Sequence, residues 1–318
     1  MNTSTTRTAA TAAACAAALL LAGCGGGDEA AGASGGLTVV AGFYPLQWAA
    51  ERVGGDRVDV SSLTPPGAEA HDLELAPQDV AAVGEADLLV YLDGFQPALD
   101  EAARSEAGDA AWDAGAAADL IAGEHTDGDH TDGEHADAEP AHGDEPVDPH
   151  FWLDPVRLAA VGDALAGELG ELDPDGAATF EQNAAALRAD LEALDAEMQT
   201  GLAGCAVDTL VTSHDAFGYL AGRYGLEVVG ISGLSPSQEP NPAQLAEIST
   251  LVRELGVTTV YTETLVDPAV AETVAEEAGV RTAVLDPLEG LTDDEAGADY
   301  LSVMRDNLTT LQDGQDCS

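Results

Sequence analysis

Short apolar runs recur along the chain from residue 37 onward, and stretches with helical spacing separate them. The runs lie at 37–41, 58–63, 88–92, 209–212, 227–230, 258–261 and 282–285. Between them, helical patterns lie at 47–53, 77–83, 241–255, 268–278 and 298–311. Strands that alternate with helices at this spacing are typical of parallel βαβ units. The pattern therefore predicts an α/β fold with two small lobes, each built on a parallel sheet.

A long helical pattern joins the two groups of strands. Asp173 and Pro174 supply a cap and a first-turn proline. Beyond them, apolar residues fall on one helical face: Phe180, Leu187, Leu191, Leu194, Met198 and Leu202. A helix of about 25 residues is roughly 38 Å long. We expect a stiff strut that lets the lobes move little against each other.

Residues 124–146 interrupt the pattern with Asp, Glu, Gly and His and almost no apolar side chains. Such a segment cannot bury enough apolar surface to offset the entropy of ordering, which predicts a disordered loop. It carries four of the seven histidines, namely His125, His130, His135 and His142. These make the loop a candidate for weak accessory metal binding that hands an ion to a tighter site, and a solvated acidic insert is the alternative.

The N-terminus has the features of an export signal. Arg7 is followed by an apolar stretch that ends in Leu21-Ala22-Gly23-Cys24. The stretch is too short for a stable membrane span. The tetrapeptide resembles the lipobox of bacterial lipoproteins, which implies that Cys24 is the acylated first residue and that the chain is anchored at the outer face of the cytoplasmic membrane. An ordinary signal with an incidental cysteine is the alternative.

These boundaries predict the domain organisation. A signal peptide (1–23) and a glycine-rich flexible tether (24–36) precede an N-terminal lobe (37–155). A helical region (156–203) and a C-terminal lobe (204–318) follow.

Charge and cysteine usage narrow the function. The formal net charge of −49 repels phosphates and so argues against nucleic acid as a partner. Outside the signal and the lipid site, the cysteines are Cys205 and Cys317. In an exported chain these predict a disulfide that staples the C-terminal tail to the second lobe.

Three histidines outside the loop each lie where a strand or its following turn ends. His71 follows the 58–63 run, His214 closes the 209–212 run, and His150 precedes an aromatic segment. Asp286 follows the 282–285 run in the same way. In open α/β sheets, ligands bind at the carboxyl ends of the strands. Three imidazoles and one carboxylate suit a tetrahedral Zn²⁺ site.

From residue 37 onward the chain resembles the zinc- and manganese-binding lipoproteins of metal ABC transporters, the ZnuA-like branch in particular. Several motifs in both halves carry the resemblance: Pro65-Pro66-Gly67, His71-Asp72-Leu73-Glu74, Asp148-Pro149-His150-Phe151-Trp152-Leu153-Asp154, Ser213-His214-Asp215-Ala216-Phe217-Gly218-Tyr219 and Leu285-Asp286-Pro287. The resemblance implies two α/β lobes bridged by a long helix, with metal between them. It also implies metal ligands at His71, His150, His214 and Asp286, with Glu69 as a weaker candidate for the fourth position.

The resemblance implies a monomer that captures one Zn²⁺ tightly and delivers it to an ABC permease. The manganese branch places Glu where His214 stands, and an imidazole there favours Zn²⁺. Manganese or iron binding within the same family is the alternative. A surface adhesin and a zinc hydrolase are more distant ones. A hydrolase is disfavoured because the chain has no His-Glu-x-x-His helix and no evident general base, so we expect no catalysis.

Overall fold

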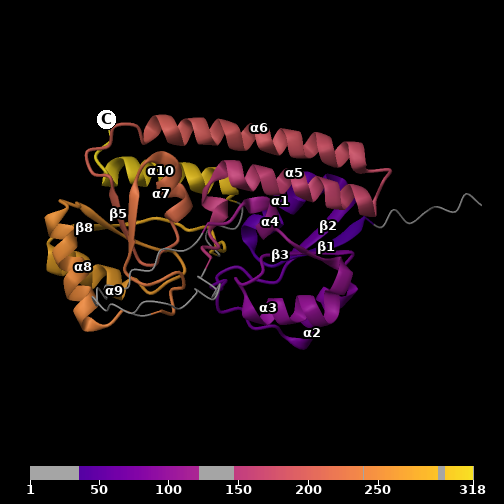
Figure 1. The fold of residues 1–318 in the computed structure, drawn as a ribbon, viewed down its shortest axis with the longest axis horizontal. Coiled ribbons are helices and arrows are strands. Elements are labelled where there is room, and N and C mark those ends of the chain that lie inside the picture. The colour runs from indigo at the N-terminus through magenta and orange to yellow at the C-terminus, as the bar shows by residue number, and fades with distance from the viewer. Residues whose placement is uncertain (1–35, 122–146, 239, 293–297, 318) are drawn as a thin grey trace, which may run out of the picture. The chain divides into compact units, whose positions relative to one another are not determined.

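Two four-stranded parallel sheets organise the chain between residues 36 and 318 (Figure 1). The computed structural model describes residues 36–121, 147–238, 240–292 and 298–317. The chain divides into two units, residues 1–35 and 36–318, and only the second is described below. The predicted signal, tether and lipid site at Cys24, and the histidine-bearing loop, lie outside the described residues, apart from Gly36 at the end of the predicted tether.

The first sheet has the strand order β2-β1-β3-β4. Its strands are β1 (Leu37–Ala41), β2 (Val58–Ser62), β3 (Leu88–Tyr91) and β4 (Ala111–Asp113). Leu37 pairs with Val58 and Val39 with Leu88, in parallel. The helices of this lobe are α1 (Tyr44–Gly54), α2 (Pro77–Glu85), α3 (Pro97–Ala102) and α4 (Gly115–Ala118).

The second sheet repeats this topology, with the order β6-β5-β7-β8. Its strands are β5 (Thr209–Thr212), β6 (Glu227–Gly230), β7 (Thr259–Thr262) and β8 (Arg281–Val284). The helices are α7 (Gly218–Tyr224), α8 (Pro242–Glu254), α9 (Ala269–Ala278) and α10 (Tyr300–Gly314). In both sheets the strand order reverses between the first and third strands of the lobe. At such a switch point the loops diverge and leave a crevice at the carboxyl ends of the strands.

Two long helices, α5 (Pro155–Leu172) and α6 (Ala177–Gly201), connect the sheets. The α6 helix packs against α5 and also contacts α1 of the first lobe and α10 of the second (Figure 1). Its buried side chains are those of the predicted apolar face, together with Ala184, except that Leu202 lies just beyond its end. The helix has the predicted length of 25 residues, but it begins at Ala177. Asp173 instead ends α5, and its carboxylate accepts from Arg57 and from the backbone of Gly176.

The sequence pattern located seven of the eight strands that the described residues form, because each of the seven contains a short apolar run. The runs of β1, β3, β5 and β7 are mostly buried, whereas β2, β6 and β8 are largely half-buried or exposed. It missed β4, which is only three residues long, and the short helices α3, α4 and α7. The predicted helical region at 156–203 contains both α5 and α6, but the pattern did not separate them. The predicted disulfide between Cys205 and Cys317 is confirmed. Among the described residues, no helix combines the length and apolarity that crossing a membrane requires.

Candidate metal site

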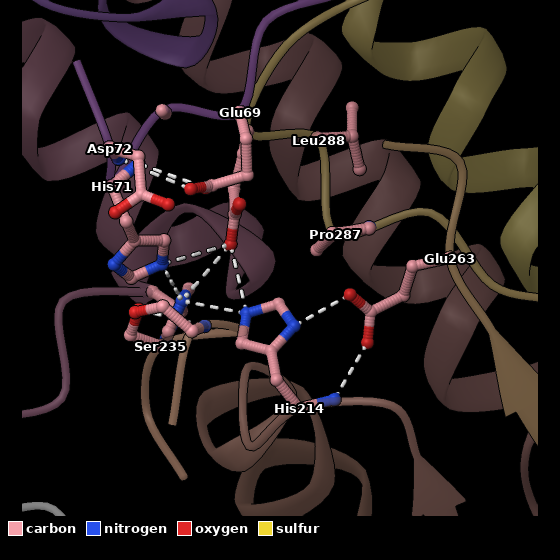
Figure 2. A network of polar contacts seen from close by, with 12 residues as sticks. Glu69, His71, Asp72, His214, Ser235, Glu263, Pro287 and Leu288 are labelled. Atoms are coloured by element: carbon pink, nitrogen blue, oxygen red, sulfur yellow. Dashed lines mark hydrogen bonds and ion pairs between the residues drawn. The ribbon is translucent and has the colours of Figure 1, made fainter. Parts of the chain in front are cut away.

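Four side chains from separate loops converge where the two lobes meet. His71 lies in the loop that follows β2, and His150 lies just before a short 3₁₀ turn at Phe151–Leu153. His214 follows β5, and Glu289 follows β8. One ligand atom from each residue lies within 4.8 Å of the others. Figure 2 shows His71 and His214 in this network of polar contacts. In the part of the chain that the structure describes, no other such group of His, Cys, Asp and Glu is found.

The donor atoms stand at the spacing of a tetrahedral zinc site. The Nε2 atom of His150 lies 3.4 Å from that of His71 and 3.3 Å from that of His214. Oε1 of Glu289 lies 3.4, 3.2 and 3.0 Å from the Nε2 atoms of His71, His150 and His214, respectively. Zn–N distances of about 2.0–2.1 Å place neighbouring donors of a tetrahedron about 3.3–3.4 Å apart. The cluster is therefore shaped for a tetrahedral ion with three nitrogen ligands and one oxygen ligand.

Two of the imidazoles are oriented by buried carboxylates. Nδ1 of His150 lies 2.7 Å from Oδ1 of Asp148, which also accepts the backbone N–H of His150. Nδ1 of His214 lies 2.6 Å from Oε2 of Glu263. Because a carboxylate accepts hydrogen bonds, each Nδ1 carries a hydrogen. Nε2 therefore faces the cluster, and it offers a lone pair to a metal ion once the imidazole is neutral.

Burial and the attraction between imidazoles and carboxylates shift the pKa values of these groups. Burial lowers the pKa of His71. Burial also acts to lower the pKa of His214, but the Glu289 and Glu263 carboxylates outweigh it and raise that pKa well above its usual range. The pKa of His150 is raised because Asp148 and Glu289 outweigh burial. Burial alone raises the pKa of Glu289, yet the three imidazoles hold it well below its usual range.

The fourth position differs from the expectation, because Asp286 does not join the group. Its Oδ1 accepts the backbone N–H of Leu288 at 2.7 Å, and Oδ2 accepts from the Thr264 hydroxyl at 3.2 Å. The Asn307 side chain holds the backbone of Asp286: its Oδ1 accepts the Asp286 N–H, and its Nδ2 donates to the Asp286 carbonyl oxygen. These contacts turn the carboxylate toward its own loop. They form the turn in which Leu288 adopts a positive φ of 56°, and the next residue, Glu289, enters the cluster.

Glu69 stands beside the site rather than within the group of donors. Its carboxylate accepts the backbone N–H groups of His71, at 2.8 Å, and of Asp72, at 3.1 Å (Figure 2). Burial and the neighbouring Glu289 charge raise its pKa to about 7. Glu69 thus fixes the loop that carries His71.

Glu289 was not among the residues that the sequence pattern singled out, and Asp148 had no predicted role. Glu289 lies three residues beyond the predicted ligand Asp286, and no periodicity in the sequence indicates which of the two acids points to the cleft. Asp148 was part of a recognised motif, and its position two residues before His150 was the available signal.

Two α/β lobes with a buried His₃Glu cluster between them define a metal-binding protein of the two-lobed type. The sequence matches the ZnuA family, described as zinc-uptake complex component A, periplasmic, over residues 39–314. The chain belongs to this family.

Named relatives support the assignment. The chain is 38% identical to the zinc-binding lipoprotein AdcA of Streptococcus pneumoniae serotype 4 over 292 residues, which cover 89% of this chain and 56% of AdcA. The chain thus spans little more than half of AdcA. It is 37% identical to the high-affinity zinc uptake system protein ZnuA of Bacillus subtilis, with 87% of each covered.

Solved structures share the fold. The structure of the laminin-binding protein Lmb of Streptococcus agalactiae, titled a bifunctional protein with adhesin and metal-transporting activity, superposes with a TM-score of 0.74 at 33% identity. The alignment covers 88% of this chain and 99% of Lmb.

Proposed function

We propose that this protein captures Zn²⁺ outside the cytoplasmic membrane and delivers it to an ABC permease. The observation that carries the proposal is the spacing of the His71, His150, His214 and Glu289 donors, at 3.0–3.4 Å for the measured pairs. We assign Glu289, in place of Asp286, as the fourth ligand. The similarity to zinc-binding AdcA and to ZnuA supports zinc as the cargo.

The donor set favours transport of zinc over the alternatives. Four protein ligands complete a tetrahedral ion, whereas a catalytic zinc keeps an open position for water. Three imidazoles suit Zn²⁺ better than the harder Mn²⁺, which prefers oxygen ligands and higher coordination. We therefore expect a solute-binding protein rather than an enzyme, with Mn²⁺ or Fe²⁺ as weaker competitors.

Membrane attachment and partners complete the proposal. We infer a lipid anchor on Cys24 at the outer face of the membrane, a monomer, and a permease that accepts the ion. Similarity to a zinc-binding lipoprotein supports the anchor. We further propose that His125, His130, His135 and His142, which lie outside the described residues, bind additional zinc weakly.

The proposal is tested by calorimetric zinc titration of protein that begins after Cys24. The wild type, His214→Ala, and a variant with the four loop histidines replaced by Ala are titrated side by side. We expect one tight equivalent in the wild type and in the loop variant, and its loss in His214→Ala. Tight binding that survives in His214→Ala but disappears in the loop variant would place the ion elsewhere.

A further inference from the structure

His150 lies at the centre of the five-residue segment 148–152, which is buried except for the half-buried Pro149 and which the other lobe holds at both ends. At one end, the Tyr219 hydroxyl of α7 donates to the carbonyl oxygen of Asp148 at 2.8 Å. At the other end, the Trp152 indole N–H donates to the carbonyl oxygen of Pro287 at 2.7 Å. The Tyr300 hydroxyl of α10 donates to the carbonyl oxygen of Trp152 at 2.6 Å.

The Trp152–Pro287 hydrogen bond joins the two chain segments that carry facing donors of the cluster. Trp152 follows His150 by two residues, and Pro287 precedes Glu289 by two residues. The bond therefore spans from one lobe to the other beside the His150–Glu289 edge, where Nε2 and Oε1 are 3.2 Å apart. A shift of either segment changes this distance directly.

Packing against neighbouring aromatic rings holds the Trp152 indole in one orientation. Trp152 is fully buried, and its ring centroid lies 4.8 Å from that of Phe43 and 5.5 Å from that of Phe95. The centroids of the Trp152 and His150 rings are 5.3 Å apart. Phe95 in turn contacts His71 at 4.6 Å, so the same aromatic wall borders two of the imidazoles.

We propose that Trp152 is a positioning residue of the metal site, whose indole N–H on the Pro287 carbonyl sets the separation of His150 from Glu289. The inference rests on the proposed function, because it assumes that the cluster holds Zn²⁺. Trp152 does not contact the ion; it acts through the two segments that it joins. Its effect is to keep the donor spacing tetrahedral, which favours Zn²⁺ over ions that take more ligands.

The test removes the indole N–H and keeps an aromatic ring, with Trp152→Phe. Trp112→Phe is the matched control, because Trp112 lies on β4 and is only partly buried. Zinc affinity is measured by competition with a chelating dye. The visible absorption of bound Co²⁺, which is strong in tetrahedral sites and weak in octahedral ones, reports the geometry. The unfolding midpoint of the metal-free protein reports stability separately.

We expect Trp152→Phe to lose roughly tenfold or more in zinc affinity and to weaken the Co²⁺ absorption, as changes around metal ligands do. Trp112→Phe is expected to leave both unchanged. A Trp152→Phe protein with wild-type zinc affinity and a wild-type Co²⁺ spectrum, whatever its unfolding midpoint, overturns the proposal.

If Trp152→Phe does not fold, incorporation of 3-benzothienylalanine at position 152 provides the same test, because sulfur takes the place of the indole N–H in a ring of nearly the same shape and only the hydrogen bond to Pro287 is lost. Weaker zinc binding with an altered Co²⁺ spectrum supports the proposal, and unchanged values overturn it. A wild-type protein that binds no zinc refutes the proposed function instead, which separates the two failures.

Discussion

The Glu263 carboxylate contacts His214 twice: Oε2 lies 2.6 Å from Nδ1, and Oε1 accepts the backbone N–H at 2.9 Å. The two residues follow β5 and β7, which are neighbours in the second sheet where the strand order reverses. The side chains of both residues are fully buried. One acid therefore fixes both the backbone and the ring of this predicted ligand.

Glu263→Gln tests this orientation. An amide keeps the shape but removes the negative charge that stabilises the hydrogen on Nδ1, so we expect zinc affinity to fall by roughly 10- to 100-fold. Glu254→Gln, at an exposed position on α8, is the control and should bind as the wild type does. Equal affinities of the two variants would show that Glu263 does not orient the ligand. Chelator competition provides the measurement.

The fourth ligand can be identified by comparing Glu289→Gln with Asp286→Asn. Glu289 faces the three imidazoles, so its neutralisation is expected to weaken zinc binding by tenfold or more, in line with the loss of a ligand charge. Asp286 holds the Leu288 turn, so Asp286→Asn should chiefly lower stability, by about 1–3 kcal/mol. Titration calorimetry and denaturant unfolding separate the two effects. The opposite pattern, with tight binding lost only in Asp286→Asn, would restore Asp286 as the ligand.

Zinc affinity should fall as the pH falls. The pKa of His214 is raised well above its usual range in the metal-free site, where burial is outweighed by Glu289 and Glu263. The metal requires the neutral imidazole, so a proton must leave when zinc binds. Tight binding is therefore present above the raised pKa and is lost progressively below it, starting at a higher pH than for an ordinary histidine.

Calorimetry in buffers with different ionisation enthalpies counts the protons released on zinc binding. We expect net release near neutral pH and a weaker affinity at about pH 5.5 than at about pH 8. Circular dichroism at each pH serves as the control for folding. An affinity that stays constant across this range in folded protein would contradict the assignment of imidazole ligands.

Reduction of the Cys205–Cys317 disulfide should destabilise the protein without altering the metal site. The bridge spans 112 positions of sequence, and constraint of the unfolded chain over such a loop contributes about 2–4 kcal/mol. Urea unfolding with and without reductant measures the loss. The Cys205→Ser/Cys317→Ser variant is the control and should not respond to reductant. A wild type whose stability is also indifferent to reductant would show that the bridge adds nothing.

The sequence by itself determined most of the architecture. Buried parallel strands are short apolar runs such as Leu88–Tyr91, and the apolar face of α6 repeats at helical spacing, so both are visible without coordinates. The sequence predicted that His71, His150 and His214 lie together, because each lies at the end of an element and parallel strands bring those ends together, and the three imidazoles do meet in one cluster.

Only the tertiary structure decided which acids lie at the cluster of histidines. Asp286 and Glu289 lie three residues apart on one loop, and the choice between them depends on a left-handed residue, Leu288, and on the contacts of Asp286. The pairing of Asp148 with His150 depends likewise on where a loop turns its side chains. Periodicity records burial along an element, but the direction of a loop side chain is set by hydrogen bonds between segments that are distant in the sequence.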